Sequence, residues 1–297
     1  MPLRSLVTQL RSAALTGELL QRTERDARLL LRGAGRISRA LVASALAQKE
    51  GRPLLVVVPT LEEAGRWTAL LELMGWGSAS LYPTSEGSPY EPFDPTSEII
   101  WGQLQVLSDL IGTDDPAGKA IVATERCLQP HLPPRQALEA TCRTLKKGDE
   151  LDLDELAETL ARLGYERVST IDQEGTWSRR GDIVDIYPVS SELPVRLEFF
   201  GEELDKLREF DPATQRSLDP VDRLQLTPTG FGPLVADQLR ESMPEGLDRL
   251  LGDEATEELL EGGTPEGLRR LMGLAWGQPA CLLDYLPASA EVVIDER

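Results

Sequence analysis

The stretch that decides the fold lies in the middle of the chain, at residues 177–188, and reads WSRRGDIVDIYP. A second run, PVRLEFFG, follows at residues 194–201. Both runs alternate charged with apolar side chains, which is typical of β-strands that bury one face. Gly181 and Asp182 are residues that tight hairpin turns favour. With a helical pattern from about Asp152 to Leu163, these strands predict a small α+β domain.

The first part of the chain has a different pattern, in which short apolar runs alternate with helical stretches. The run Pro53–Pro59 is almost wholly apolar, as strands buried on both faces are. Thr60 lies where a helix N-cap is expected, with Glu63 three residues later. Further strands are predicted at Arg28–Leu31, Ser78–Tyr82 and Ala120–Thr124, and helices at Ser38–Lys49, Thr60–Met74 and Ser97–Ile111. This order predicts a parallel sheet with helices on both sides.

A phosphate loop without its functional residues is expected between the first strand and the helix that follows it. In the motif GxxxxGK[ST], glycine amides surround phosphate, the lysine reaches it and the hydroxyl binds Mg²⁺. Counted from Gly33, the second glycine position is Ser38. The lysine position is Arg39, and the hydroxyl position is Ala40, which cannot bind a metal. We therefore expect no hydrolysis and no cofactor; a plain turn between strand and helix explains the same residues.

The end of the chain completes the expected fold. Residues 291–296, EVVIDE, are apolar enough to rejoin the first sheet and resemble a Walker B strand, but we interpret Asp295 as a vestige. The fold class is therefore α/β, with a degenerate P-loop (RecA-like) parallel-sheet domain interrupted by a small α+β insertion domain. Residues 1–126 and 211–297 form the two parts of the degenerate domain, and residues 127–210 form the insertion.

The composition argues against several classes of function. The net charge is −19, with thirteen basic and fifteen acidic residues up to residue 126, eleven and eighteen in 127–210, and seven and seventeen thereafter. Tight DNA binding needs a basic face, so we do not expect this chain to bind DNA tightly by itself. Three scattered cysteines and a single histidine, His131, predict neither a disulfide framework nor a metal site. No apolar run approaches the roughly 18 residues that span a bilayer, and no secretory signal is recognisable, so we expect a cytoplasmic protein.

Several motifs then suggest a family. They are YER at 165–167, RGDIVDIYP at 180–188, RLEFF at 196–200, DPAT at 211–214 and LLDYLP at 282–287. These resemble the excinuclease B subunit, UvrB. The stretches YEPFDP at 90–95 and LKKG at 145–148, with the decayed phosphate loop, bring the chain closer to the amino-terminal UvrB-like module of bacterial transcription-repair coupling factors (Mfd).

Two departures from UvrB favour the coupling-factor module. UvrB keeps an intact phosphate loop, and it has a long tyrosine-rich hairpin that grips damaged DNA. Here only Tyr82–Glu98 occupies the place of that hairpin. No second helicase lobe follows Arg297, so the motor of either relative is expected to be missing from this chain.

The resemblance implies that the insertion domain binds the excinuclease A subunit, UvrA. The family's contact residues correspond to Arg167, Arg180, Arg196 and Glu198. Arg196 and Glu198 are two apart on a strand and share one face, and the planar fork of arginine suits carboxylates across an interface. We expect an aromatic anchor and additional charge at the rim of the site from Trp177 and Arg179.

Some neighbouring residues have other expected roles. Ser178 stands where the family has an arginine, and Tyr187, Leu197, Phe199 and Phe200 are expected in the core. A simpler interpretation is that Arg196 and Glu198 only form exposed cross-strand pairs.

The leading hypothesis is a non-catalytic interaction module of transcription-coupled nucleotide excision repair that recruits UvrA. In this family the full-length protein is an ATP-dependent DNA translocase. Its RNA polymerase and double-stranded DNA partners are expected to bind at other domains. This module is also expected to restrain the motor of the full-length protein, by covering the same surface that binds UvrA. The alternative is a residual Mg²⁺-dependent ATPase or nuclease that uses Asp295 and Glu296, or Asp182 and Asp185. Direct DNA binding is a third hypothesis, which predicts a steep dependence on salt.

Overall fold

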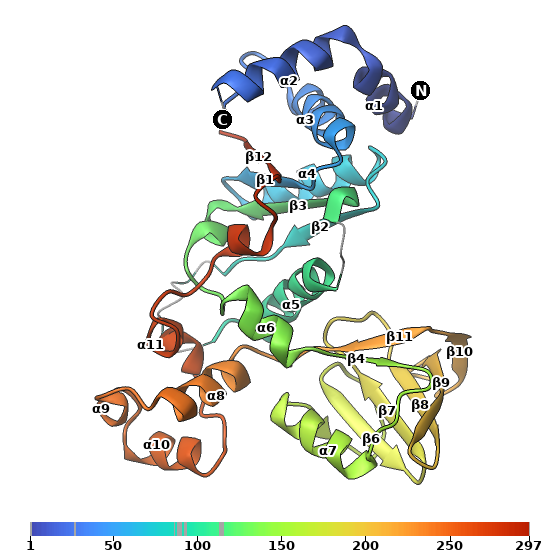
Figure 1. Ribbon diagram of the computed structural model, residues 1–297, viewed down its shortest axis with the longest axis vertical. Helices are drawn as coiled ribbons and strands as arrows, with labels where there is room; N and C mark the ends of the chain where they lie inside the picture. The colour runs from blue at the N-terminus through green and yellow to red at the C-terminus, as the bar shows by residue number, and fades with distance from the viewer. Residues whose placement is uncertain are drawn as a thin grey trace. The chain divides into compact units, whose positions relative to one another are not determined.

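The computed structural model describes residues 2–26, 28–85, 87, 91, 94–112 and 116–296. The chain divides into two compact units (Figure 1). Unit 1 comprises Met1–Thr84, Thr113–Gln129 and Leu282–Arg297, and unit 2 comprises Ser85–Gly112 and Pro130–Cys281. Each unit has its own sheet and its own core.

Unit 1 is built on a parallel sheet. Among the described residues its strand order is β12-β1-β3-β2. The bounds are β12 Glu291–Ile294, β1 Leu54–Val58, β3 Lys119–Thr124 and β2 Ser78–Tyr82. All three pairings are parallel, and β12 pairs with β1. The predicted parallel sheet and the return of the last strand to it are confirmed.

The helices of unit 1 cover one face of this sheet. Small residues of α3 and the Trp67 ring of α4 pack on Leu54, Val56 and Val58 of β1. The helix α4 begins as predicted, because the Thr60 hydroxyl accepts a hydrogen bond from the Glu63 amide. The helical segments are α1 Leu3–Ser12, α2 Ala14–Asp26, α3 Arg36–Glu50, α4 Leu61–Glu72, η1 Pro116–Gly118, η2 Glu125–Leu128 and η4 Leu282–Tyr285.

The strand predicted at Arg28–Leu31 is wrong. Residues 28–35 form neither strand nor helix, and Leu30 is 73% exposed. A short leucine run becomes a strand only where a neighbouring strand supplies hydrogen-bond partners and packing, and no strand in the described part of the chain pairs with this segment. The sheet is parallel as expected, but a phosphate-loop strand is not part of it.

Unit 2 contains a separate β-sheet region. In the described part of this unit a six-stranded sheet has the order β10-β9-β8-β7-β6-β5, and β11 pairs with β4. The strands are β4 Arg143–Lys146, β5 Glu166–Arg167, β6 Thr176–Arg180, β7 Ile183–Tyr187, β8 Val195–Phe200, β9 Glu203–Phe210, β10 Ser217–Pro220 and β11 Arg223–Leu226. Neighbours from β6 to β10 are antiparallel. The predicted hairpin turn at Gly181 and Asp182 joins β6 to β7, with Gly181 at a left-handed φ of 64°.

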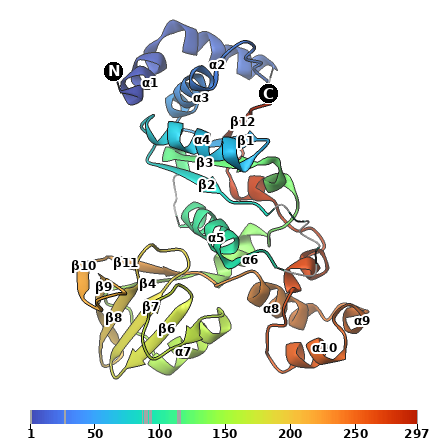
Figure 2. The same cartoon turned by 180° about the vertical axis from the view of Figure 1, so that it is seen from behind.

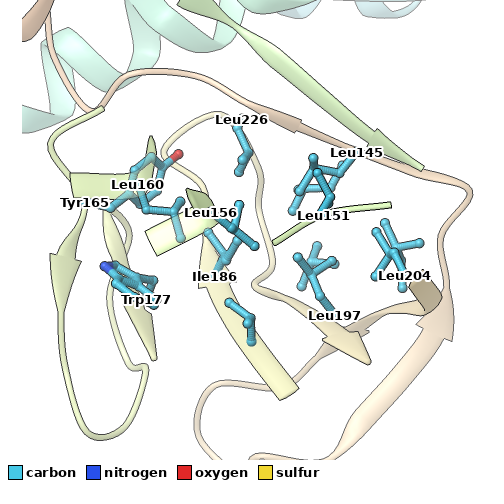
Figure 3. Close-up of a cluster of buried hydrophobic side chains, with 14 of the residues drawn as sticks. Leu145, Leu151, Leu156, Leu160, Tyr165, Trp177, Ile186, Leu197, Leu204 and Leu226 are labelled. Carbon is cyan, nitrogen blue, oxygen red and sulfur yellow. The ribbon is translucent and has the colours of Figure 1, made fainter. Parts of the chain in front are cut away.

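One face of the six-stranded sheet is buried against α7, Leu153–Arg162, and the β4–β11 pair (Figures 1 and 2). Leu156 and Leu160 of α7 point into a cluster with Trp177, Ile186 and Leu197 of the sheet (Figure 3). The helix begins where expected, because the Asp152 carboxylate accepts from the amides of Asp154 and Glu155, the second and third residues of the helix. The predicted α+β architecture between Asp152 and Phe210 is confirmed.

The remaining helices of unit 2 flank this region in the chain. They are α5 Ser97–Ile111, α6 Arg135–Thr141, α8 Gly232–Ser242, α9 Leu247–Leu251, α10 Asp253–Leu260, η3 Leu268–Leu271 and α11 Met272–Ala275. Strands β10 and β11 lie after residue 210 in the sequence. However, β10 pairs with β9 and β11 pairs with β4, and both of these partners end at or before residue 210. The three-part division at residues 126 and 210 therefore stays a prediction, while the contacts define two units.

Candidate functional site

The six-stranded sheet of unit 2 has a second face, which we call the outer face. Because side chains alternate along a strand, residues paired across strands lie on the same side. Asp185 pairs with Arg196, and Ile183 pairs with Glu198. The side chains of these two pairs point away from the core, whereas Val184 and Leu197, which pair between them, point into it. The outer face includes Ser178, Arg180, Ile183, Asp185, Arg196, Glu198, Phe200, Lys206 and Arg208.

A buried carboxylate organises the outer face. Asp185 is 1% exposed, and its Oδ1 accepts from Arg196 Nε at 2.7 Å. Its Oδ2 accepts from Arg196 Nη2 and from Arg180 Nη2, each at 2.9 Å. A buried carboxylate needs such compensation, because its desolvation is costly unless it is paired and hydrogen-bonded. Asp185 thus fixes the directions of two arginine side chains, a role that the sequence analysis missed.

Arg196 is held from several sides. Its guanidinium lies 4.8 Å from the Phe210 ring centroid, and its Nη1 donates to the Gln215 carbonyl at 3.5 Å. Gln215 has a left-handed φ of 61°, and its side-chain amide donates to two backbone carbonyls. The hydrogen bonds that Arg196 donates to Asp185 raise the pKa of Arg196. With its side chain only 15% exposed, Arg196 is mainly a structural partner of Asp185.

Arg180 and Glu198 of the outer face are more accessible than Arg196. The Arg180 side chain is 57% exposed although one nitrogen binds Asp185, so other N–H groups remain open to solvent. Glu198 is 32% exposed and lies 3.3 Å from Lys206 Nζ, whose pKa this hydrogen bond raises. The outer face therefore presents charges of both signs.

Phe200 lies on the surface and not in the core. It was expected in the core, but it is 83% exposed, whereas Leu197 and Phe199 are buried as expected. Phe200 shares the side of Glu198, two residues earlier, and directly precedes the Gly201 turn between β8 and β9. The alternation of apolar with charged residues contained this signal. With Ile183, 37% exposed, Phe200 gives the outer face an apolar component.

The other predicted residues lie on the core side of the sheet or at its edge. Trp177 is 4% exposed within the core cluster, so it does not present its ring to a partner as an anchor would. Arg167 of the edge strand β5 lies over that ring, 5.2 Å from its centroid. Arg179 pairs across strands with the core residue Val184 and binds Asp154 of α7 at 2.6 Å. The structure therefore does not place all six predicted residues on one surface.

Ser178, which replaces an expected arginine, contributes no charge to this surface. It pairs across strands with Asp185 and is 3% exposed. The two arginines that bind the Asp185 carboxylate are Arg180, on the same strand β6 as Ser178, and Arg196 on β8.

Residues 144–230, which contain the outer face, match the family model of the UvrB interaction domain. The chain contains a UvrB interaction domain. The matched residues begin within β4 and end after β11. These two strands are paired with each other although they are about 80 residues apart in the sequence, so the match extends across this pairing.

Similarity extends beyond this domain. The chain is 30% identical over 286 residues to the transcription-repair-coupling factor of Bacillus subtilis, covering 90% of this chain and 24% of that protein. The factor of Mycobacterium tuberculosis is 31% identical over 309 residues, covering 99% and 25%, and that of Escherichia coli is 28% identical over 285 residues, covering 90% and 23%. The chain thus spans about a quarter of these relatives and resembles their UvrB-like module.

Outside the UvrB interaction domain, the predicted nucleotide loop does not fit a nucleotide and its metal. Gly33 lies in irregular backbone, and Ser38, Arg39 and Ala40 already belong to α3. Ala40 is fully buried, and Arg39 forms an ion pair with Asp295, the acid of the Walker B-like strand. The cation and the acid that would serve a bound nucleotide therefore bind each other.

The alternative hypothesis of a metal-dependent enzyme gains no support from these contacts. Within the described residues, no group of three or more His, Cys, Asp and Glu side chains is arranged to hold a metal ion. Asp185 and Asp295 are both compensated by arginines. Among the residues that the structure describes, no helix is long and apolar enough to cross a membrane. The stretch YEPFDP, which lies where UvrB has its hairpin, is partly outside the described residues, so the expected absence of the hairpin stays a prediction.

Proposed function

We propose that the outer face of the UvrB interaction domain binds UvrA, and that the chain acts as a non-catalytic recruiting module in transcription-coupled nucleotide excision repair. One observation carries the proposal: the outer face presents an exposed arginine, Arg180, and an exposed aromatic ring, Phe200, on a rigid sheet. The family name of residues 144–230 and the names of the relatives support it.

The chemistry of the outer face suits a protein partner. Arginine and aromatic residues dominate binding hot spots, because they combine large buried area with directed hydrogen bonds. The free N–H groups of Arg180 suit a carboxylate of the partner, and Phe200 suits an apolar pocket. Glu198, beside Lys206, suits a cationic group at the rim.

Asp185 supports binding as a positioning residue, and we do not expect it to touch the partner. It holds Arg180 and Arg196 before association, so less side-chain freedom is lost when the complex forms. Arg167, at the edge of the sheet and stacked on Trp177, is placed to add a peripheral contact only.

The charge of this chain also bears on the DNA-dependent activities expected of a longer protein. With a net charge of −19, this chain has no basic excess with which to hold DNA. We therefore propose that contacts with RNA polymerase and double-stranded DNA, and ATP-driven translocation, belong to other domains of a longer protein.

The test is calorimetric titration of UvrA with the wild-type chain and with Arg180→Ala. Loss of one hot-spot arginine commonly costs about 2 kcal/mol, or roughly 30-fold in affinity. We expect a loss of that size and a fall in the free energy of unfolding of less than about 1 kcal/mol, because Arg196 still pairs with Asp185 when Arg180 is removed.

The matched control is Arg179→Ala, the neighbouring residue on the other side of the sheet, which should bind like the wild type. Equal affinity of Arg180→Ala and the wild type, or no binding by the wild type, would contradict the proposal. Arg196→Ala is a poorer test, because Arg196 is largely buried and donates two of the three arginine hydrogen bonds described for the buried Asp185.

A further inference from the structure

The two remnants of the nucleotide motif form one polar cluster in unit 1. Arg39 Nη1 of α3 donates to Asp295 Oδ1, directly after β12. Trp67 Nε1 of α4 donates to the other oxygen, Oδ2, at 2.7 Å. Asp295 is 7% exposed, Trp67 is fully buried, and the Arg39 side chain is 26% exposed. A single carboxylate thus joins the last strand to two helices that lie more than 200 residues earlier in the chain.

A second cluster reinforces the same two helices. Arg36, at the start of α3, forms an ion pair with Glu63 in the first turn of α4. Glu63 is 4% exposed and also binds Arg66 at 3.1 Å. The helix ends that in a phosphate-loop protein would face the nucleotide are therefore held together by side chains of the protein itself.

The strand β12 has little apolar burial to hold it. Val292 is 42% exposed and Ile294 is 63% exposed, and Val293 is only partly buried against the core of unit 1. It is also an edge strand, paired only with β1 among the described residues. Since hydrophobic stabilisation is roughly proportional to the apolar area removed from water, polar contacts must account for much of what keeps β12 in place.

We propose that Arg39, Trp67 and Asp295 form a clasp that occupies the place of the nucleotide and its metal and holds β12 in the parallel sheet. The guanidinium supplies the positive charge that a metal ion and lysine would supply beside the acid, and the indole fills the remaining side of the carboxylate. Asp295 is then a structural group with an internal partner, and the module is stable without a nucleotide.

The test is hydrogen exchange of the β12 backbone, where the Glu291 amide donates to Pro53 and the Asp295 amide donates to Val57. Arg39→Ala leaves a buried carboxylate without its charged partner, and we expect protection of β12 to fall about ten-fold or more relative to the wild type. The matched control is Arg52→Ala. Arg52 also reaches this strand, at Glu291, but over 3.7 Å and with its side chain 36% exposed, so we expect a change of less than about two-fold.

Chemical rescue separates a clasp from general destabilisation. Methylguanidinium at millimolar concentration should restore protection in Arg39→Ala, because it can bind the vacated side of Asp295, and should not do so in Asp295→Ala. If Arg39→Ala does not fold, Trp67→Phe removes one donor and keeps most of the ring, and should lower protection to a smaller extent.

Two outcomes would overturn the clasp. One is exchange of β12 in Arg39→Ala, or in Trp67→Phe if that variant must be used, that equals exchange in Arg52→Ala. The other is protection of wild-type β12 by millimolar Mg-ATP that is lost in Arg39→Ala, since a nucleotide would then occupy the place assigned to the clasp. Neither outcome bears on UvrA binding.

Discussion

Two arginine–aspartate clusters, one in each unit, use the same chemistry for different ends. Asp185 in unit 2 and Asp295 in unit 1 lie in or directly after a strand, and both are almost fully buried. Asp185 holds Arg196 and an Arg180 side chain that stays 57% exposed. Asp295 holds Arg39 and accepts from the buried Trp67 indole. The first cluster presents an arginine to solvent, whereas the second closes a site.

The surrounding layers explain this difference. The antiparallel sheet of unit 2 buries one face against α7. On the other face Tyr187 and Phe210 pack in a second buried cluster, but the Arg180 side chain stays exposed, so its charge can reach a partner. Around β1 of unit 1 both faces are buried, and α3 and α4 cover the side where the clasp lies. An ion pair becomes an interaction surface or an internal connection according to what covers it.

Removal of the Asp185 carboxylate is the change with the largest expected effect. Asp185→Ala leaves Arg196 largely buried without its ion-pair partner, and breaking such a pair commonly costs about 3–5 kcal/mol. We expect the free energy of unfolding of unit 2 to fall by about 3 kcal/mol on this basis. Urea unfolding, followed by circular dichroism, measures the change.

The comparison becomes sharper with Asp185→Asn, which keeps the shape and one acceptor but removes the charge. It should cost less than Asp185→Ala and should still weaken UvrA binding, because the arginines lose their fixed directions. A loss below about 1 kcal/mol in Asp185→Ala would contradict the central position of this carboxylate, since losses of that size are typical of ordinary substitutions.

Local patterns predicted much of the fold correctly. The apolar run ending at Val58, the Thr60 cap and the alternation through β6 to β9 each depend on neighbours in sequence. The strand expected at Arg28–Leu31 failed because strand formation depends on a partner that the sequence does not show. Likewise, the pairing of Arg39 with Asp295 joins residues 256 apart, so neither residue alone reveals it.

The candidate site was predictable only in part. The resemblance identified Arg180 and Glu198, which the structure places on the outer face. It could not show that Trp177 is buried or that Asp185 determines the directions of the arginines, because both depend on packing across strands.

Phe200 offers a way to separate the contribution of the outer face to UvrA binding from its contribution to stability. Because its side chain is 83% exposed, Phe200→Ala should change the free energy of unfolding by less than about 0.5 kcal/mol. If it fills an apolar pocket of UvrA, its loss should cost about 1–2 kcal/mol of binding, or roughly 5- to 30-fold. Calorimetric titration with UvrA measures this effect.

Leu218→Ala is the matched control for Phe200→Ala. Leu218 lies on β10 of the same sheet and is 44% exposed, so it tests whether any exposed apolar residue matters. We expect it to bind UvrA like the wild type. Equal losses in the two variants would mean that the apolar contribution is not specific to the outer face.

The smallest effect is expected where an arginine binds an exposed carboxylate. Arg179 Nη1 lies 2.6 Å from Asp154 Oδ1, closer than either arginine lies to Asp185, yet the Asp154 side chain is 87% exposed. Exposed pairs contribute only about 0–1 kcal/mol, because water already solvates both charges. Arg179→Ala should therefore lower the free energy of unfolding by about 0.5 kcal/mol at low salt, and by less at 1 M salt, where screening shortens the range of the interaction to about 3 Å. Urea unfolding at the two salt concentrations checks this. A salt-independent loss above about 1.5 kcal/mol would mean that distance, rather than burial, decides what these clusters contribute, since exposed pairs do not reach that value.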